Sequence, residues 1–315
     1  MAEKKAVNKV VEPTNEEIDA HVDQLVAKAQ VALSKFEEFT QEQVDYIVAK
    51  CSVAGLDAHG TLAEAAVNET GRGVFEDKAV KNLFACEYVT SNLRHLKTVG
   101  IINEDPLLGI TEIAEPVGVV CGIVPTTNPT STVIFKSLIC LKTRNPIIFS
   151  FHPSAHACSV MAAVVIRDAA IAAGAPEDCI QWLDLKSMYA TTALMKHPGV
   201  ATILATGGNA MVAAAYSCGK PALGVGAGNV PAYVEKTCVL PRAVNDIVLS
   251  KSFDNGMICA SEQAAIVDTE IYDAFMKEIK RFKVYFVNKE EKAKLETFMF
   301  GAVAYSDNVN AAKLN

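Results

Sequence analysis

The sequence lacks the cysteine patterns that disulfide-bonded and zinc-binding proteins require. Its nine cysteines are spread over 315 residues, with no Cys-x-x-Cys pair and no cluster of cysteine and histidine at the spacing of zinc ligands. Neither disulfides nor a metal site are therefore expected. Most of the thiols are predicted to be small, buried apolar side chains, so a functional cysteine has to be recognised by its surroundings.

Long runs of one charge and long apolar runs are missing as well. The chain has 29 Lys and Arg against 36 Asp and Glu, a net charge of −7, and no block of like charges that nucleic acid or anionic lipid would attract. No apolar run approaches the ~18 residues of a membrane helix, and the first residues lack the apolar core of a signal peptide. We expect a cytoplasmic protein that binds neither nucleic acid nor membranes.

What the sequence does contain is enough apolar residues for a packed core, at 50% of the chain. The first hundred residues predict helices. Apolar residues recur at helical spacing from Ile18 to Phe36, and Thr40-x-x-Gln43 and Thr61-x-x-Glu64 match capping boxes that open two further helices. A fourth helix is expected over residues 76–97.

After Gly100 short apolar runs alternate with helical segments, which is typical of parallel strands buried on both faces. The predicted strands are 117–124, 146–150, 180–183, 200–205 and 232–234, and the predicted helices are 130–142, 155–173, 187–196 and 210–217. This pattern predicts a doubly wound, Rossmann-like α/β sheet, in which ligands bind beyond the carboxyl ends of the strands.

The remaining residues predict the start of a second domain. A helix over 242–252 is followed by a strand at 264–267, a helix at 271–282, a strand at 284–287 and a helix from 290. We therefore place a cofactor-binding domain with its N-terminal helices at residues 1–249 and part of an α/β catalytic domain at 250–315.

One cysteine, Cys259, stands in a setting that suggests chemistry. A turn at Asn255-Gly256 delivers it just before a predicted strand, so its thiol is expected to be accessible on a loop. Free cysteines are commonly buried, and composition alone does not set this one apart.

The motifs taken together are highly specific. They are EPVGVVCGIVPTTNPTSTVIFKSLICLKTRNPIIFSFHP, LATGG, SCGKPALGVGAGN and SKSFDNGMICASEQ, in that order. This order and spacing resemble the aldehyde dehydrogenase superfamily, within it the CoA-acylating branch, and most of all the amino-terminal domain of the bifunctional aldehyde–alcohol dehydrogenases. The resemblance extends over nearly the whole chain.

The resemblance implies that Cys259 is the catalytic nucleophile. Its thiolate would add to an aldehyde carbon, a hydride would pass to NAD+, and the resulting thioester would be handed to an acceptor. The Asn128 amide and the backbone N–H of Cys259 would stabilise the oxyanion of the tetrahedral intermediate. From the residues alone, Asn128 before Pro129 is equally typical of a helix cap.

The resemblance also places a site for NAD. Thr206-Gly207-Gly208 ends a strand and opens a helix, where free N–H groups suit a pyrophosphate, whereas Gly224-Val225-Gly226 opens no helix and is weak evidence by itself. His152 is placed near the adenosine ribose. The residues implied to line the site are Ile123, Val124, Pro125, Thr126, Thr127, Asn128, Gly208 and Gly226.

A departure from the hydrolytic aldehyde dehydrogenases bears on the acyl acceptor. They carry a water-activating glutamate in a Glu-Leu-Gly-Gly pattern, and the corresponding position here is Gly224. The implied acceptor is coenzyme A, and acetaldehyde would be converted reversibly to acetyl-CoA.

Two alternative functions stay open: a CoA-linked propanal or semialdehyde dehydrogenase, or an inactive fragment with a structural role. Relatives of this kind form oligomers, so a homo-oligomer is also expected.

Overall fold

The computed structural model describes residues 13–301 and divides them into two compact units. The first comprises the chain up to Asn229 together with Ser252–Ser261, and the second comprises Val230–Lys251 and the residues from Glu262 onward. The predicted boundary after residue 249 lies close to the point where the chain returns to the first unit, but residues 230–249 pack with the second. The prediction that the first residues lack a signal peptide concerns a segment of which residues 1–12 lie outside the described residues.

A five-stranded parallel sheet forms the centre of the first unit, in the order β5-β4-β3-β6-β7. The chain builds outward from β3 to β5 and then crosses to β6 on the other side of β3, so the order reverses between β3 and β6. The predicted doubly wound α/β fold is therefore confirmed. The strands are β3 (Val119–Val124), β4 (Ile147–Phe151), β5 (Ile180–Trp182), β6 (Val200–Thr206) and β7 (Ala222–Val225).

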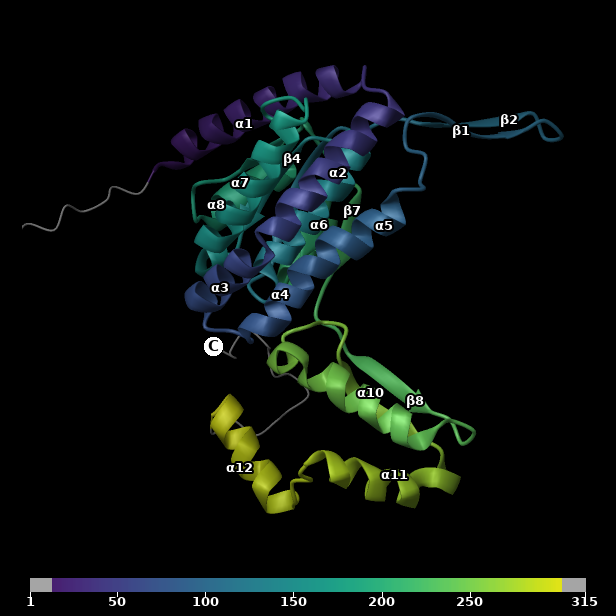
Figure 1. Cartoon of the computed structure of the whole chain (residues 1–315). Helices are drawn as coiled ribbons and strands as arrows, with labels where there is room; N and C mark the ends of the chain where they lie inside the picture. Colours follow the sequence, from purple (N-terminus) through teal and green to yellow (C-terminus); the bar gives the residue numbers. More distant parts are fainter. Residues whose placement is uncertain (1–12, 302–315) are drawn as a thin grey trace, which may run out of the picture. The chain divides into compact units, whose positions relative to one another are not determined.

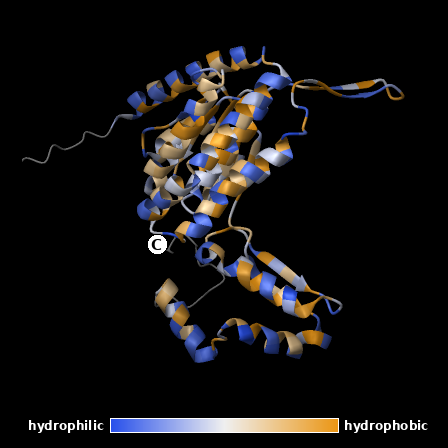
Figure 2. Cartoon of the chain, in the orientation of Figure 1, coloured by the Kyte–Doolittle hydropathy of each residue, from blue (hydrophilic) through white to orange (hydrophobic). Residues whose placement is uncertain are grey.

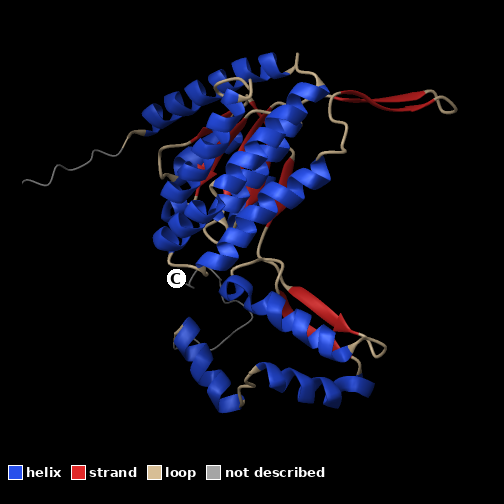
Figure 3. Ribbon diagram, in the orientation of Figure 1, coloured by secondary structure: helices blue, strands red, loops and turns tan. Residues whose placement is uncertain are grey.

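Alternate residues of β3 face two separate cores. Val120 and Val124 pack into one cluster, and Val119, Cys121 and Ile123 pack into the other. Helices cover both faces, as Figure 3 shows for this unit. The first cluster receives residues of α2 (Gln41–Asp57), α6 (Pro129–Lys142) and α7 (His156–Ala172), and the second receives those of α1 (Asn15–Phe36), α8 (Met188–Lys196) and α9 (Asn209–Tyr216).

The N-terminal helices follow the predicted pattern with two corrections. The capping box at Thr40 is confirmed, but the one predicted at Thr61 is wrong: α3 (His59–Thr70) begins two residues earlier because Ala58 continues the helical backbone from α2. The helix expected to end at residue 97 ends at Leu93. It consists of α4 (Phe75–Leu83), a π-helical turn η1 (Phe84–Tyr88) and α5 (Val89–Leu93).

A β-hairpin was not predicted. Strands β1 (Gly100–Asp105) and β2 (Ile110–Ala114) pair antiparallel, and the hairpin projects from the rest of the first unit (Figure 1). Apolar residues are distributed along it and at its tip (Figure 2), where Leu107 is 95% exposed. The alternation of apolar and polar residues that marks a half-buried strand is absent, and no described residue covers either face of the hairpin.

One segment, Pro153–Ala172, combines a length of 20 residues with a mean hydropathy of 1.5, which would suffice for a membrane span. It contains α7, and Arg167 and Asp168 interrupt its apolar run. Ala162, Ala163 and Ile166 pack in the core cluster shared with α2 and α6. Packing inside the first unit accounts for its apolar character.

The second unit is smaller. Strands β8 (Val230–Val234) and β9 (Glu262–Val267) pair parallel, and its helices are α10 (Leu240–Ser252), α11 (Tyr272–Ile279) and α12 (Lys289–Phe300). Val234, Val244 and Phe275 form the centre of its core. The strand predicted at 284–287 is wrong: the segment has no regular structure, and among the described residues no strand lies beside it to complete its hydrogen bonds.

Candidate active site

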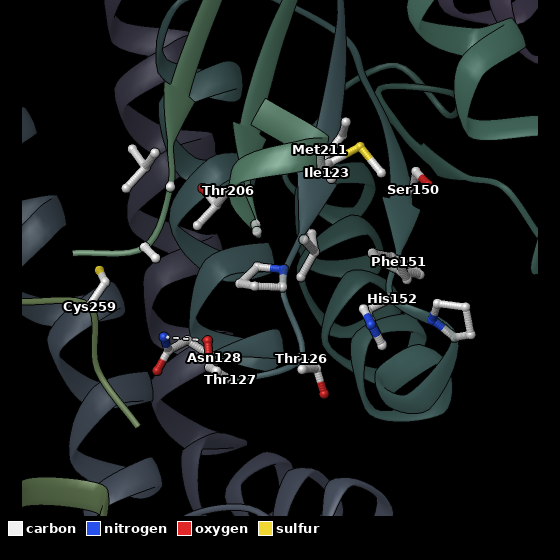
Figure 4. A pocket seen from close by; sticks show the side chains of 18 of the residues that line it. Ile123, Thr126, Thr127, Asn128, Ser150, Phe151, His152, Thr206, Met211 and Cys259 are labelled. Atoms are coloured by element: carbon white, nitrogen blue, oxygen red, sulfur yellow. Dashed lines mark hydrogen bonds between the residues drawn. The ribbon is translucent and has the colours of Figure 1, made fainter. Parts of the chain in front are cut away.

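A cavity of about 660 Å³ opens at the carboxyl ends of the strands of the first unit. Its walls come from the segments that follow all five strands of this sheet and from the loop carrying Cys259. Figure 4 shows the Cys259 sulfur on the same side of the pocket as Asn128, with Phe151 and His152 on the opposite side. The cavity brings together every residue that the sequence suggested: Ile123, Val124, Pro125, Thr126, Thr127, Asn128, His152, Gly207, Gly208, Gly226 and Cys259.

Cys259 differs from the other cysteines in its exposure. All nine lie within the described residues, and Cys259 is the exposed one, whereas six are buried and two, Cys218 and Cys238, are partly exposed. Burial raises the pKa of several thiols to about 12, among them Cys86, Cys121 and Cys140. Buried thiols of this kind stay protonated and unreactive at neutral pH, so the prediction of one accessible cysteine among packing cysteines is confirmed.

The loop before Cys259 is held in an unusual conformation. Asp254 and Asn255 both adopt left-handed backbone angles, with φ of 51° and 54°. Asp254 is fully buried: its Oδ1 accepts from the Val74 N–H at 2.8 Å, and its own N–H donates to Asp77 Oδ2 at 2.6 Å. The loop is therefore tied to the beginning of α4, a link that nothing in the sequence pattern indicated.

Two glycines after β7 allow close approaches, Gly228 to the Cys259 loop and Gly226 to the start of α9. A Cβ at Gly228 would lie 2.0 Å from the carbonyl oxygen of Cys259, and a Cβ at Gly226 would lie 2.7 Å from Asn209 Oδ1. The Gly228 contact is with backbone, so glycine there is a requirement of packing, whereas a side chain at position 226 would have to displace the Asn209 side chain. The glycine-rich segment after β7, which was weak evidence in the sequence, thus lines the pocket and also packs closely against its neighbours.

Asn128 precedes α6 but does not cap it. Pro129 occupies the first helical position, and the Asn128 side chain makes no capping hydrogen bond. Instead Oδ1 accepts from Lys81 Nζ at 2.6 Å, and Nδ2 donates to Thr127 Oγ1 at 3.1 Å. Asn128 therefore occupies the N-cap position of α6, but a capping role for its side chain is excluded.

The turn after β6 has the features of an anion site. Gly208 is the N-cap of α9 and provides no side-chain cap, so N–H groups of the first helical turn keep their capacity to donate. The Asn209 side chain is engaged elsewhere, accepting from the Ala227 N–H at 3.1 Å. A phosphate placed here would also meet the positive end of the helix dipole.

His152 follows β4 at the other side of the pocket. Its Nδ1 contacts the Ser154 hydroxyl at 2.8 Å, and partial burial, followed by the charge of Arg72, lowers its pKa. Both effects favour the neutral imidazole at neutral pH. Sequence reasoning missed the lining residues Leu185, Lys186, Ser187 and Met188, although they follow the predicted strand at 180–183 and therefore reach the same edge of the sheet.

No carboxylate is present among the described residues that line the pocket. The position expected to replace the water-activating glutamate, Gly224, lies in β7, and a Cβ there would meet Val212 and Tyr216 of α9 at 2.6 and 2.7 Å. Any side chain at this position would have to displace the side chains of Val212 and Tyr216.

These features place an exposed cysteine in a cavity at the carboxyl ends of the strands, and the sequence comparisons show the family to which the chain belongs. The chain matches the aldehyde dehydrogenase family over residues 3–311 and belongs to it. It is 71% identical to aldehyde-alcohol dehydrogenase 2 of Entamoeba histolytica, over 95% of this chain and 34% of that protein. The bifunctional aldehyde-alcohol dehydrogenase of Escherichia coli is 50% identical, over 86% and 30%. The chain thus spans about a third of the length of these two relatives.

Solved structures show the same fold. An acetylating aldehyde dehydrogenase from Geobacillus thermoglucosidasius is 46% identical with a TM-score of 0.87, over 92% of this chain and 64% of that one. A propionaldehyde dehydrogenase from Rhodopseudomonas palustris, solved with bound CoA and an acylated cysteine, is 31% identical with a TM-score of 0.78, over 89% and 64%. An engineered glycolyl-CoA reductase with bound NADP+ is 31% identical with a TM-score of 0.78, over 95% and 66%.

Proposed function

We propose that the chain carries the cofactor site and nucleophile of an NAD-dependent, CoA-acylating aldehyde dehydrogenase that interconverts acetaldehyde and acetyl-CoA. The observation that carries this proposal is the placement of the exposed Cys259 in one pocket with the Asn128 amide and the glycine-rich turns. The names of the similar proteins support the reaction class.

Cys259 begins the reaction by adding its sulfur to the aldehyde carbon, and the carbonyl oxygen becomes an oxyanion. The Nδ2 group of Asn128 and the backbone N–H of Cys259 are the donors proposed to stabilise that charge. NAD+ supplies the hydride acceptor when bound, and loss of the hydride leaves a thioester on Cys259. The thiolate of CoA then takes the acyl group and restores the cysteine.

The choice of CoA over water is supported by the composition of the pocket. Water attacks a thioester slowly unless a general base removes its proton, and no carboxylate is found among the described lining residues. A thiol acceptor has a lower pKa than water and needs less help. The CoA-bound relative with an acylated cysteine fits this scheme.

For NAD, the pyrophosphate is proposed to lie at the start of α9, beside Gly207 and Gly208, with His152 toward the adenosine ribose. The segment Ile123 to Asn128 and Gly226 complete the walls. Comparing reduction rates with NAD+ and NADP+ tests the preference for NAD.

The aldehyde is proposed to be acetaldehyde. The runner-up is propanal or a semialdehyde, because propionaldehyde and acetylating succinate-semialdehyde dehydrogenases are also among the similar proteins. Rates with aldehydes of increasing chain length decide between them.

We further propose that the chain acts in the cytoplasm as a homo-oligomer. The β1–β2 hairpin supports self-association, because it exposes Leu107, Leu108, Ile110 and Ile113 to solvent. Apolar surface of this kind is commonly covered by a partner. Light scattering that reports only monomers would contradict the oligomer.

The function is tested by mixing the protein with NAD+ and acetaldehyde, with and without CoA, and following NADH absorbance. We expect CoA-dependent NADH formation that Cys259→Ala abolishes and Cys218→Ala, the control at a partly exposed cysteine, leaves intact. Equal rates without CoA would contradict the acylating assignment. No rate in either case would favour the alternative of a structural fragment.

A further inference from the structure

The ammonium group of Lys81 connects the two sides of the proposed oxyanion site. Lys81 lies on α4, and its side chain is 9% exposed. Its three N–H donors have three acceptors: Asn128 Oδ1 at 2.6 Å, Asp254 Oδ2 at 2.5 Å and the Met257 carbonyl at 2.8 Å. No donor of the ammonium is left over for a ligand.

The contact with Asn128 fixes which end of its amide faces the pocket. A lysine ammonium has no acceptor, so the amide atom beside it has to be the oxygen. The Nδ2 end is then turned away from Lys81, and one of its two N–H groups donates to Thr127 Oγ1. The second N–H remains to be donated to a developing oxyanion.

The contact of Lys81 with the Met257 carbonyl concerns the second proposed oxyanion donor, the backbone N–H of Cys259. Met257 lies two residues before Cys259, in the segment whose start is held by the buried Asp254. Lys81 therefore binds the amide side chain and the nucleophile loop through one nitrogen atom. Loss of its charge would release both at once, whereas loss of either acceptor would release only one.

We propose that Lys81 is a positioning residue that orients the Asn128 amide and the Cys259 loop for oxyanion stabilisation. This role rests on the proposed function, since it concerns the same tetrahedral intermediate. The neighbouring Lys78 provides a matched control. Its ammonium donates to Asp254 Oδ2 and the Thr127 carbonyl, both at 3.0 Å, and it makes no contact with the Asn128 side chain.

The test compares two reactions of the Cys259 thiol in the full chain. Acylation by p-nitrophenyl acetate, followed as a burst of p-nitrophenolate, passes through a tetrahedral oxyanion. Alkylation by iodoacetamide is a direct displacement with no oxyanion. We expect Lys81→Met to slow acylation about 10²-fold, as for the loss of one oxyanion donor, and to leave alkylation near the wild-type rate. Lys78→Met removes another partner of Asp254 but no contact of the Asn128 side chain, and it is expected to slow acylation less than Lys81→Met does.

A double-mutant cycle separates this role from general support of the fold. If Lys81 acts in part through the amide, Lys81→Met should slow acylation by a smaller factor in the Asn128→Ala background, where only its contact with the loop remains to be lost, than in the wild type. Multiplied losses in the double variant, or equal losses in acylation and alkylation, would overturn the positioning role. A wild-type thiol that alkylates but does not acylate would overturn the proposed function and this role with it.

The alkylation experiment also reports whether each variant is folded, because the six buried cysteines react only after unfolding. If mass spectrometry shows that Lys81→Met exposes them, Lys81→Gln is measured instead. Its side chain keeps a neutral donor for one of the three acceptors, and we expect about a tenfold loss of acylation with alkylation unchanged. An unchanged acylation rate in Lys81→Gln would overturn the proposal.

Discussion

The Cα of Gly228 lies so close to the nucleophile loop that a Cβ at this position would be 2.0 Å from the carbonyl oxygen of Cys259. The contact is with backbone, which cannot move aside as the end of a flexible side chain can. The position of Cys259 therefore depends on the missing side chain of Gly228.

We expect Gly228→Ala to displace the Cys259 loop and to lower the rate of acyl transfer by at least about 10²-fold, because small misplacements at a reacting centre are costly. Gly60→Ala is the matched control: Gly60 lies in α3, and a Cβ there would meet nothing within 4 Å. Steady-state rates and thermal melts of both variants check the prediction. An active Gly228→Ala would show that the loop is less constrained than the packing indicates.

Asn128→Ala is expected to lower kcat by about 10²–10³-fold, the usual loss for one oxyanion donor, with a smaller effect on KM. Because the Asn128 side chain makes no capping hydrogen bond to α6, the variant should not lose the free energy of unfolding that removal of a helix cap usually costs. Steady-state kinetics and denaturant unfolding measure the two effects. A variant that loses stability while keeping kcat would instead assign Asn128 a structural role.

Lys136 of α6 predicts a pH dependence of stability. Its buried Nζ donates to the carbonyls of Ile123 and Leu204, both at 2.6 Å, and burial lowers its pKa to about 7 from an ordinary value of 10.5. Two acceptors match the two N–H groups of a neutral amine. Between these pKa values the unfolded chain binds more protons than the folded one, so the stability contributed by this group increases as pH rises.

The measurement is the free energy of unfolding of the wild type minus that of Lys136→Met, across pH 6 to 8.5. We expect this difference to be flat below pH 7 and to rise by about 1.4 kcal/mol per pH unit above it. The cysteines are common to both proteins, so their titration cancels. A difference that is constant with pH would mean that Lys136 stays charged in the fold.

The sequence predicted the centre of the sheet well because β3 and β4 are buried on both faces and therefore read as continuous apolar runs. It missed β7, which is short, contains Gly224 and is partly exposed, so its pattern is that of a loop. It also missed the β1–β2 hairpin. The wrong strand at 284–287 has apolar residues but no neighbouring strand in the described part of the chain, and a strand needs a partner to form.

The site residues were predicted from motifs, and the structure added the contacts between residues that lie far apart in the sequence. The turn at Gly207 and Gly208 was placed by the predicted strand 200–205, because the carboxyl ends of parallel strands meet at one edge, whereas Gly226 was placed by the family resemblance. The contact of Lys81 with Asp254 joins positions 173 residues apart, and no local pattern in α4 distinguishes Lys81 from a solvated lysine. Likewise, only the structure could show that the Asn128 side chain contacts Lys81 and does not cap the start of α6.

The most direct test of the account is to incubate the full chain with acetyl-CoA and locate any acetyl group by peptide mass spectrometry. We predict a thioester on Cys259, release of an equal amount of free CoA, and loss of the label when excess CoA is added back. Acetyl groups on other residues, or a Cys259 thiol that stays unmodified while the folded protein is intact, would contradict the claim that Cys259 carries the acyl group.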